Sequence, residues 1–491
     1  MENVNLIGPQ LLLMAVGGLL LICDAFAGLL GARRWMAWYV VGTPGLALLG
    51  GLGSLLWAVA HAATDTRGSA FFDTYVLDDF SLFFAVLFAG VVIAVVLFSV
   101  DYLRGNRHQA EYYALVLASA AGLMFLAGAR DLIAIFVALE LTSICQFILA
   151  GFLKDDRSSE AGIKYLLLGA VAAALTLYGM ALLFGLSGST SLEGIARAAA
   201  EADDQRLGFV LASVLLAAGL GFKMAIVPFQ MWVPDVYQGA PTPVTGYLSV
   251  GSKAAGFAVA ARVFVEGLGQ GAIAPDWATM FAVLSVLSMT LGNVVALVQN
   301  DIKRLLGYSS IAQAGYFLIG LAAVAAGEPQ VELGLGGLLF FAASYAFTNL
   351  GAFACVIAIS QRIHSDSIAD YTGMARRSPL LALALTLCLV SLTGIPPTAG
   401  FVAKLYIFNA AVQADLVWLA IAGVINSVIS AYYYLRIVLN MYVGEPVSPE
   451  PVRPTPLLAV TVAAAVAGLL VLGVFPFPVI DAAEAAARAF S

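Results

Sequence analysis

The sequence predicts an all-α integral membrane protein with about fourteen transmembrane helices. Hydrophobic residues make up 62% and charged residues 11% of its 491 residues, and the mean hydropathy is +0.95. These values lie outside the range of soluble domains. Apolar runs of about 20 residues, the length at which a helix crosses a bilayer, recur along the chain and leave no room for a soluble domain. Proline and glycine interrupt two of the runs, and both of these also contain a lysine.

Charged residues, Gly/Pro clusters and polar loops mark the ends of the apolar runs. The runs cover residues 5–28, 36–60, 80–101, 111–129, 131–153, 161–186, 207–236, 243–266, 275–299, 303–324, 333–359, 379–412, 415–441 and 456–477. The first run has no A-x-A-like cleavage site and is long enough to span, so it is predicted to be a helix and not a signal peptide. The tail from Pro478 to Ser491 is predicted to be an amphipathic helix at the membrane interface.

No pattern in the sequence indicates a cofactor on this chain. The cysteines are Cys23, Cys145, Cys355 and Cys388, and the histidines are His61, His108 and His364. The cysteines lie in apolar runs without metal-ligand spacing, as packing residues do. The histidines fall at helix ends or in loops, which leaves no haem or metal constellation. The absence of a G-x-x-x-x-G-K-[ST] loop argues against ATP hydrolysis.

Ionisable residues stand inside four of the apolar runs. Lys223 and Lys253 lie on adjacent spans, and Lys404 lies in the twelfth. Glu140 lies roughly 14 Å down the fifth span at 1.5 Å per residue, close to the midplane. An ammonium at bilayer depth costs at least a few kcal/mol, so these lysines indicate a function. A nearby carboxylate would stabilise the charged lysine, so each lysine's protonation depends on that distance, as a proton switch requires.

A static buried ion pair is the structural alternative for these charges. Three mid-span lysines face one mid-span glutamate, however, so the charges do not balance in pairs. Lys154, Lys164 and Lys303 are predicted to be ordinary helix-end residues whose charged groups reach the membrane surface.

Prolines are predicted to break two spans beside their lysines. In KMAIVPFQMWVP, Pro228 and Pro234 follow Lys223, and in SLTGIPPTAGFVAK, Pro396 and Pro397 precede the lysine. Proline removes a backbone donor and clashes with the preceding turn of a helix. Backbone groups freed at this depth must be buried in protein or face a water-filled cavity. Each break is therefore a predicted place where water reaches a lysine.

The broken spans are five helices apart, so they cross the membrane in opposite directions. Inverted repeats of this kind occur in many transporters. The predicted units are residues 1–110 with spans 1–3, 111–266 with spans 4–8 as the first repeat, 267–441 with spans 9–13 as the second, and 442–491 with the last helix and tail.

Small polar residues gather on the tenth and eleventh spans, between Lys253 and Lys404 along the chain. They are Ser309, Ser310, Gln313, Tyr316, Tyr345, Thr348 and Asn349. Such residues often hydrogen-bond neighbouring helices. As a group they also form a candidate hydrated path.

Orientation follows from the positive charges, which concentrate on the cytoplasmic side. One set of alternate loops and helix ends holds Arg33, Arg34, Arg104, Arg107, Lys154, Arg157, Lys164, Lys303, Arg304, Arg362, Arg376, Arg377, Arg436 and Arg453. The other holds Arg67, Arg130, Arg197, Arg206, Arg262 and Arg488. This bias predicts that both termini lie outside the cytoplasm.

Four stretches resemble the antiporter-like membrane subunits of respiratory complex I and their relatives in multisubunit sodium/proton antiporters. They are GFKMAIVPFQMWVPDVYQGAPTPVTGYLSVGSKAA, NDIKRLLGYSSIAQAGYFLIGL, LELTSICQFILAGF and SLTGIPPTAGFVAKLYIF. The resemblance covers nearly the whole chain. It implies a fourteen-helix proton channel in a bacterial inner membrane, with two inverted five-helix bundles and an interrupted helix in each.

The resemblance also implies roles for single residues. Glu140 would be the carboxylate paired with Lys223, Lys253 would lead to the second bundle, and Lys404 would end the relay. Gln230 departs from the family, which commonly has histidine there. Flavin (FMN), iron–sulfur clusters and quinone would belong to partner subunits, and the partners would include sister antiporter-like subunits and the lipid bilayer, with no nucleic acid.

The predicted function is that of a proton-translocating membrane subunit of a NADH:quinone oxidoreductase, with no redox chemistry on this chain. One alternative is a subunit of a sodium/proton antiporter or of a membrane-bound hydrogenase, which would share the same charges. Another is a stand-alone transporter of an organic solute, which would need a midplane pocket with several polar groups.

Overall fold

The computed structural model describes residues 2–27, 38–64, 66–201, 203–269, 273–326, 330–446, 448 and 450–490. Arg33 and Arg34, which contribute to the predicted orientation, lie outside the described residues.

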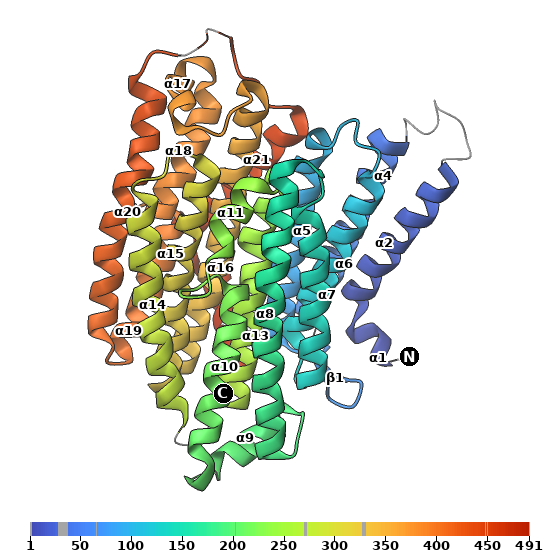
Figure 1. Ribbon diagram of the computed structural model, residues 1–491, viewed down its shortest axis with the longest axis vertical. Helices are drawn as coiled ribbons and strands as arrows, with labels where there is room; N and C mark the ends of the chain where they lie inside the picture. Colours follow the sequence, from blue (N-terminus) through green and yellow to red (C-terminus); the bar gives the residue numbers. More distant parts are fainter. Residues whose placement is uncertain are drawn as a thin grey trace.

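The helices follow one another with short connections, and Figure 1 shows them standing side by side as a bundle. The first part contains α1 (Glu2–Leu6), α2 (Gly8–Ala27), η1 (Trp38–Gly42), α4 (Thr43–Ala62), the hairpin β1 (Gly68–Ala70) and β2 (Tyr75–Leu77), and α5 (Asp79–Tyr102). The middle contains α6 (Gln109–Gly128), α7 (Leu132–Ala150), α8 (Asp156–Ser187), α9 (Leu192–Ala200), η2 (Asp203–Gln205), α10 (Arg206–Met224), α11 (Trp232–Gly239), α12 (Thr242–Tyr247), η3 (Leu248–Ser252), α13 (Lys253–Ala261) and η4 (Arg262–Gly267). The last part contains α14 (Ala274–Ala296), α15 (Ile302–Ala323), η6 (Val324–Ala326), α16 (Gln330–Ile363), η7 (Ile368–Tyr371), α17 (Met374–Arg377), α18 (Pro379–Thr393), α19 (Ala399–Gln413), α20 (Val417–Val443), α21 (Pro456–Val474), α22 (Phe477–Ala487) and η8 (Arg488–Phe490).

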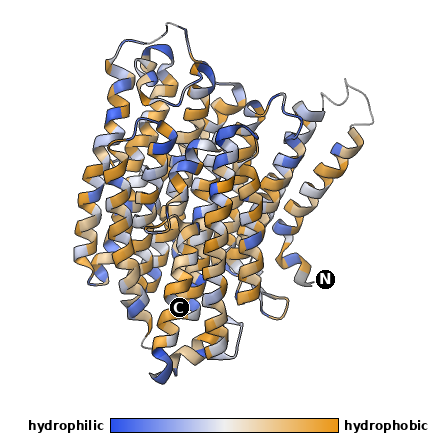
Figure 2. Cartoon of the chain, in the orientation of Figure 1, coloured by the Kyte–Doolittle hydropathy of each residue, from blue (hydrophilic) through white to orange (hydrophobic). Residues whose placement is uncertain are grey.

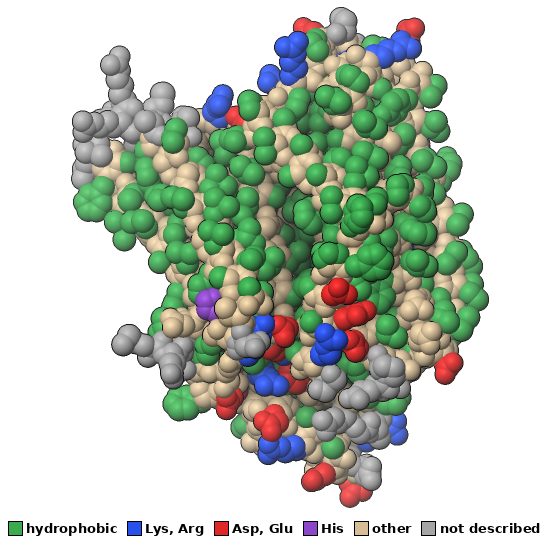
Figure 3. Space-filling model, turned by 180° about the vertical axis from the view of Figure 1, so that it is seen from behind, with side chains coloured by type: hydrophobic (Ala, Val, Ile, Leu, Met, Phe, Trp, Pro, Cys, Tyr) green, Lys and Arg blue, Asp and Glu red, His purple; other side chains and the backbone are tan. Residues whose placement is uncertain are grey.

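Within the described residues, thirteen helices are long and apolar enough to cross a membrane, and α18 is a shorter apolar helix. With α18 and α19 taken together as one broken span, this confirms the predicted all-α membrane fold. Figure 2 shows hydrophobic residues along most of the helix lengths and hydrophilic residues gathered toward the ends. Figure 3 shows the same pattern on the back surface, where a broad hydrophobic band separates charged side chains at the two ends.

Aspartates start four of the spanning helices. The side chains of Asp78, Asp131, Asp155 and Asp301 accept hydrogen bonds from backbone N–H groups in the first turns of α5, α7, α8 and α15. An aspartate at this position satisfies donors that have no partner inside the helix. This is why the charged residues that delimit the apolar runs also mark where the helices begin.

Three spans occupy the centre of the bundle. In the 18-residue apolar stretch of Thr242–Gly267, Ile302–Ala323 and Gln330–Ile363, 94% of the residues are buried, whereas the share is 28% in Gly8–Ala27 and Thr43–Ala62. A helix that is buried on every side belongs to the interior. Lys253 and the polar residues of the tenth and eleventh spans therefore lie inside the protein and away from lipid.

Both predicted breaks occur. One separates α10 from α11 at residues 225–231, and the other separates α18 from α19 at residues 394–398. Figure 1 shows that α10 leads up into α11 while α18 leads down into α19, so the broken spans run in opposite directions. Pro228, Pro396 and Pro397 lie in the breaks. Pro234 does not: it lies in the first turn of α11, where a helix tolerates a missing N–H.

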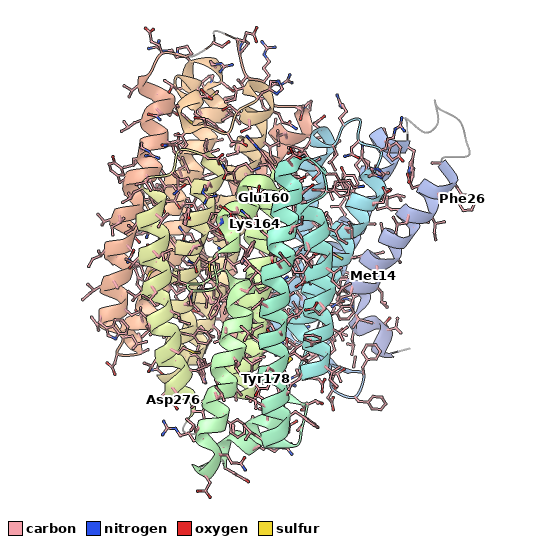
Figure 4. All side chains as sticks on the ribbon, in the orientation of Figure 1. Met14, Phe26, Glu160, Lys164, Tyr178 and Asp276 are labelled. Atoms are coloured by element: carbon pink, nitrogen blue, oxygen red, sulfur yellow. The ribbon has the colours of Figure 1, made fainter. Side chains whose placement is uncertain are left out.

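Ion pairs fix helices at each end of the bundle. Near the upper end, Asp235 on α11 accepts from Lys164 on α8 and from Arg304 on α15, each at 2.7 Å. Figure 4 shows Lys164 in the upper part of α8 and Asp276 near the lower end of the bundle, where Arg206 binds Asp276 at 2.9 Å. The short helix α11 is thus held by charges on two neighbours.

The C-terminal helix differs from the prediction of an interfacial helix. Instead, α22 packs against α16 and α5, and Ala483, Ala486 and Ala487 are fully buried. The hydroxyl of Tyr406 also donates to Glu484. The apolar side of this helix therefore faces protein.

Candidate functional site

Lys223 lies in the last turn of α10, and its side chain is only 4% exposed. Its ammonium donates to Gln146 Oε1 at 2.8 Å, Thr142 Oγ1 at 2.9 Å and Ser143 Oγ at 3.4 Å. The three acceptors lie on two successive turns of α7. The ammonium of Lys223 is therefore bound by neutral polar side chains of α7, which is the predicted fifth span.

Glu140 lies on the same helix, about one turn before Ser143, and is half-buried. Glu140 and Lys223 line one small cavity together with Thr176, with about 30 Å³ of space for water. Both residues lie in the described part of the chain, and they form no ion pair within 4.0 Å. Since about 10–15 Å³ holds one water, the cavity has room for water between carboxylate and ammonium.

Gln146 is a polar centre that the sequence reasoning did not single out. Besides the bond from Lys223, its Oε1 accepts from Ser252 Oγ at 3.0 Å and Tyr165 OH at 3.3 Å, and its Nε2 donates to Ser119 Oγ at 3.2 Å. A glutamine in the apolar run LELTSICQFILAGF was the available signal. It joins Lys223 to the residue that precedes Lys253.

Lys253 starts α13 directly after the π-helical turn η3 and is 2% exposed. Its ammonium donates to the carbonyl and the hydroxyl of Ser310 on α15, and lies 5.2 Å from the ring centroid of Tyr345. Tyr345 OH donates to Ser310 Oγ at 3.1 Å, and Tyr237 OH lies 3.2 Å from the same atom. Ser310 is therefore the shared partner of one lysine and two tyrosines.

Lys404 is 5% exposed and binds the broken end of α18. Its ammonium donates to the carbonyls of Thr393 at 2.9 Å and Leu392 at 3.1 Å, and to Ser427 Oγ at 3.2 Å. It also lies 4.3 Å from the ring centroid of Tyr316. The last carbonyls of a helix lack intrahelical partners, so this break supplies acceptors to the lysine.

The polar face of α15 extends from Ser310 toward Lys404. Gln313 lies one turn after Ser310, and its Nε2 donates at 3.0 Å to the Leu392 carbonyl that also accepts from Lys404. Ser427 Oγ donates to Tyr316 OH at 3.1 Å. Four of the predicted path residues, Ser310, Gln313, Tyr316 and Tyr345, thus lie between or against the two lysines.

The remaining predicted path residues connect helices. Ser309 hydrogen-bonds Tyr434, Thr348 bonds Ser391 Oγ at 2.9 Å, and Asn349 Nδ2 donates to Ser249 Oγ at 2.6 Å. Among the described side chains, Asn349 Oδ1 and Gln230 Oε1 are buried without a hydrogen-bond partner.

No metal site is apparent in the chain as far as it is described: no group of three His, Cys, Asp or Glu side chains stands close enough to hold an ion.

The family described as NADH:quinone oxidoreductase/Mrp antiporter, TM, matches residues 129–430. NADH-quinone oxidoreductase subunit N of Dehalococcoides mccartyi is 43% identical over 490 residues, covering 98% of this chain and 99% of that protein. The chain belongs to the subunit N family of NADH-quinone oxidoreductases. The subunit N of Trichlorobacter lovleyi is 40% identical over 492 residues, covering 99% of this chain and 97% of the relative.

Solved structures agree with the subunit N assignment. A chain of respiratory complex I from Thermus thermophilus with bound Aureothin matches with a TM-score of 0.78 and 33% identity, over 96% of this chain and 98% of that one. A chain of the Mrp complex from Dietzia sp. has a TM-score of 0.85 and 21% identity, over 100% and 97%, which shows the shared fold alone. The predicted resemblance is confirmed.

Proposed function

We propose that this chain translocates protons as the subunit N of a NADH:quinone oxidoreductase, along a relay of Glu140, Lys223, Lys253 and Lys404. One observation carries the proposal: the three lysines are buried, and each binds neutral oxygen atoms. A static ion pair, the structural alternative, would place a carboxylate against each ammonium. An ammonium bound only by neutral groups can lose its proton without leaving an uncompensated buried anion.

The contacts suggest the order of transfer. Lys223 and Ser252 share Gln146, Ser252 precedes Lys253, and Lys253 binds Ser310. One turn further along α15, Gln313 shares an acceptor with Lys404. A signal from quinone chemistry would change the separation of Glu140 and Lys223, and so change how strongly Lys223 holds its proton. The proton would then pass through Lys253 toward Lys404.

All redox chemistry would belong to partner subunits, which would hold FMN, the iron–sulfur clusters and the quinone. Sister antiporter-like subunits would be direct neighbours in a bacterial inner membrane. The exposure of Pro228, Pro396 and Pro397 supports such neighbours. Irregular backbone at membrane depth is found buried in protein or lining water, not against lipid.

The solute-transporter alternative fits the structure less well. Small-molecule sites have volumes of roughly 300–1,000 Å³, whereas the cavity beside Lys223 offers about 30 Å³ for water. The antiporter alternative shares the fold. The 43% identity to a subunit N favours the quinone-linked complex over both the antiporter and the hydrogenase alternatives.

The test replaces Lys223 or Glu140 by alanine in the complete complex. Assembly is verified by native gel and by NADH oxidation with an artificial acceptor, which does not involve this chain. We expect proton pumping and coupled quinone reduction to fall at least tenfold in each variant. Lys154→Ala, at an exposed loop lysine, is the control and should pump normally. Full pumping in both test variants would refute the relay.

A further inference from the structure

A groove opens between the first turns of α10 and α14. It offers about 640 Å³ of space, and the residues that line it are Asp204, Arg206, Leu207, Val210, Asp276 and Thr279. Figure 4 shows Asp276 near the lower end of the bundle, so the groove lies at the end opposite to α17. We call it the α10–α14 groove. Its volume falls within the roughly 300–1,000 Å³ of small-molecule sites, so it can hold a headgroup and the first part of an acyl chain.

One wall of the α10–α14 groove is an apolar stripe of α10. Leu207, Leu211 and Val214 are spaced i, i+4 and i+7, so they share one face of the helix, and all three are exposed. Leu207, which lines the groove, is 83% exposed. Apolar surface of this kind is stabilised when hydrocarbon covers it. The stripe therefore suits an acyl chain that runs from the end of the helix toward the membrane interior.

The other wall is the matching face of α14. Thr279 lines the groove, and Val283 and Leu287 follow it at i+4 and i+8 and are exposed. From Asp276 to Leu287 the helix rises roughly 16 Å at 1.5 Å per residue. Half of a hydrocarbon core is about 15 Å. The apolar walls thus have the depth of one lipid leaflet.

Charged side chains stand at the open end of the α10–α14 groove. Arg206 donates through Nε and Nη2 to the carboxylate of Asp276 at 2.9–3.2 Å. A guanidinium has five donors, and no described residue accepts from Nη1 of Arg206. The side chain of Arg206 is 53% exposed, so this nitrogen is open to a ligand. Asp204 adds a second, exposed carboxylate.

These charges favour one class of phospholipid. One guanidinium and two carboxylates leave one negative charge in excess. A phosphate oxygen can accept from Nη1 of Arg206, and a primary ammonium on the same headgroup can pair with Asp204 and balance the excess. Phosphatidylglycerol and cardiolipin bring negative charge alone beside the two carboxylates, which is unfavourable. Phosphatidylcholine has no N–H to donate. Phosphatidylethanolamine has both required groups.

We propose that the α10–α14 groove binds a phosphatidylethanolamine molecule, with its phosphate on Arg206, its ammonium on Asp204 and an acyl chain between the two apolar walls. The bound lipid reinforces the contact between α10 and α14 beside the ion pair of Arg206 with Asp276. These helices belong to different predicted repeats. The site is separate from the proposed relay, because none of the relay residues lines the groove.

The test places the complete complex in phosphatidylcholine nanodiscs that contain a small, equal fraction of photoreactive phosphatidylethanolamine or photoreactive phosphatidylglycerol. Both lipids carry a diazirine at the same position of an acyl chain. After illumination, peptide mass spectrometry counts lipid adducts on residues 206–214 and 276–287. Residues 177–184 of α8, which include exposed Leu177, Tyr178 and Phe184 near the same end, report bulk lipid.

We expect the ratio of phosphatidylethanolamine adducts to phosphatidylglycerol adducts to be at least fivefold higher at the groove than on residues 177–184. Equal ratios at the two places would mean bulk lipid only and would overturn the proposal. Adducts from neither lipid at the groove would mean that a protein segment fills it, which also overturns the proposal.

Charge variants test the selection of the headgroup. Asp204→Asn combined with Asp276→Asn leaves Arg206 as the one charge of the lining, so the preference should pass to phosphatidylglycerol. Asp204→Asn alone leaves the ion pair intact and should lower the adduct ratio at least twofold. Asp415→Asn, at an exposed aspartate of the same end, is the control and should keep the ratio of the parent. Native gels verify assembly, and an unchanged ratio in assembled Asp204→Asn overturns the proposal.

Discussion

Gln146 joins Lys223 to the residue that precedes Lys253. Its single carboxamide oxygen accepts hydrogen bonds from Lys223, Ser252 and Tyr165. Since it is neutral, it stabilises the ammonium of Lys223 without trapping the proton as a carboxylate would. Its hydrogen bonds also link α7 to α8, to α10 and to the span Thr242–Gly267, which contains Ser252.

Replacing Gln146 by leucine tests this role at the scale of one residue. A hydrogen bond to a charged group contributes about 1.5–3 kcal/mol, so the variant should pump protons roughly tenfold more slowly, or worse, in inverted vesicles. Gln109→Leu is the matched control, because Gln109 is also buried and its Nε2 binds the Leu103 carbonyl outside the relay. Equal rates in the two variants would show that the hydrogen bonds of Gln146 are unnecessary for transfer.

At the scale of elements, each helix break begins with a residue whose backbone has the left-handed helical conformation. Ala225 ends α10 with φ 63°, and Gly394 ends α18 with φ 90°. This conformation costs a residue with a side chain about 1–2 kcal/mol and costs glycine little. At Gly394 an added Cβ would also lie 2.9 Å from Cδ of Lys404. The second break therefore requires glycine for backbone and side-chain reasons.

Gly394→Ala should destabilise the second break by about 2 kcal/mol through left-handed strain and should also displace the side chain of Lys404. We expect a lower midpoint of thermal unfolding for the purified complex and slower pumping. The reciprocal change, Ala225→Gly, relieves strain and loosens the unfolded chain, so its stability should stay within about 1 kcal/mol of the parent. An unfolding midpoint for Gly394→Ala no lower than that of Ala225→Gly would contradict this account.

The inverted-repeat boundaries at residues 111–266 and 267–441 stay a prediction. The opposite directions of α10 and α18 in Figure 1 favour it. The two lysines differ in one respect: Lys223 lies before its break, and Lys404 lies after its break.

At the scale of the whole molecule, a buried guanidinium ties distant segments together. Arg262 is fully buried, although the sequence placed it among ordinary helix-end arginines. It donates to both carboxylate oxygens of Asp78 at 2.7 Å and to Glu266 at 3.2 Å. Its guanidinium carbon lies 4.8 Å from the ring centroid of Phe80 and 5.0 Å from that of Phe490. The third span, the eighth span and the end of the chain meet at this one side chain.

Arg262→Met should destabilise the subunit by about 3–5 kcal/mol, because it removes the buried cation that pairs with both oxygens of Asp78, whereas Glu266 keeps its pair with Arg130. Thermal unfolding of the assembled complex measures the effect. Arg197→Met is the control: Arg197 pairs with Glu193 on the surface, and an exposed i, i+4 pair contributes roughly 0.3–0.5 kcal/mol. Similar midpoints for the two variants would contradict a stabilising role for Arg262.

The orientation of the molecule in the membrane can be tested separately. Figure 1 shows both ends of the chain toward the end of the bundle opposite to α17, whose Arg376 and Arg377 belong to the positively charged set. The positive-inside bias then places both termini outside the cytoplasm. Alkaline phosphatase, which is active only outside the cytoplasm, should be active when fused at the C-terminus and inactive when fused in the loop at Glu450. The reverse pattern would invert the orientation.

Much of the fold could be predicted from the sequence because membrane spans are encoded locally. Without water in the bilayer, each backbone segment must satisfy its own hydrogen bonds, so about 20 apolar residues form a helix wherever they occur. The predicted span at residues 80–101, for example, corresponds to the helix Asp79–Tyr102 in the structure. The depth of Lys223, Lys253 and Lys404 was set in the same way, by their distance along each run.

The tertiary structure alone decided which groups meet. Lys223 binds Gln146, which is 77 residues away, and Lys253 binds Ser310, which is 57 residues away. The burial of Lys303 and of Arg262 also depends on neighbouring helices. Sequence spacing sets the depth and the face of a residue on its own helix, but the helix that this face meets depends on packing across the whole bundle.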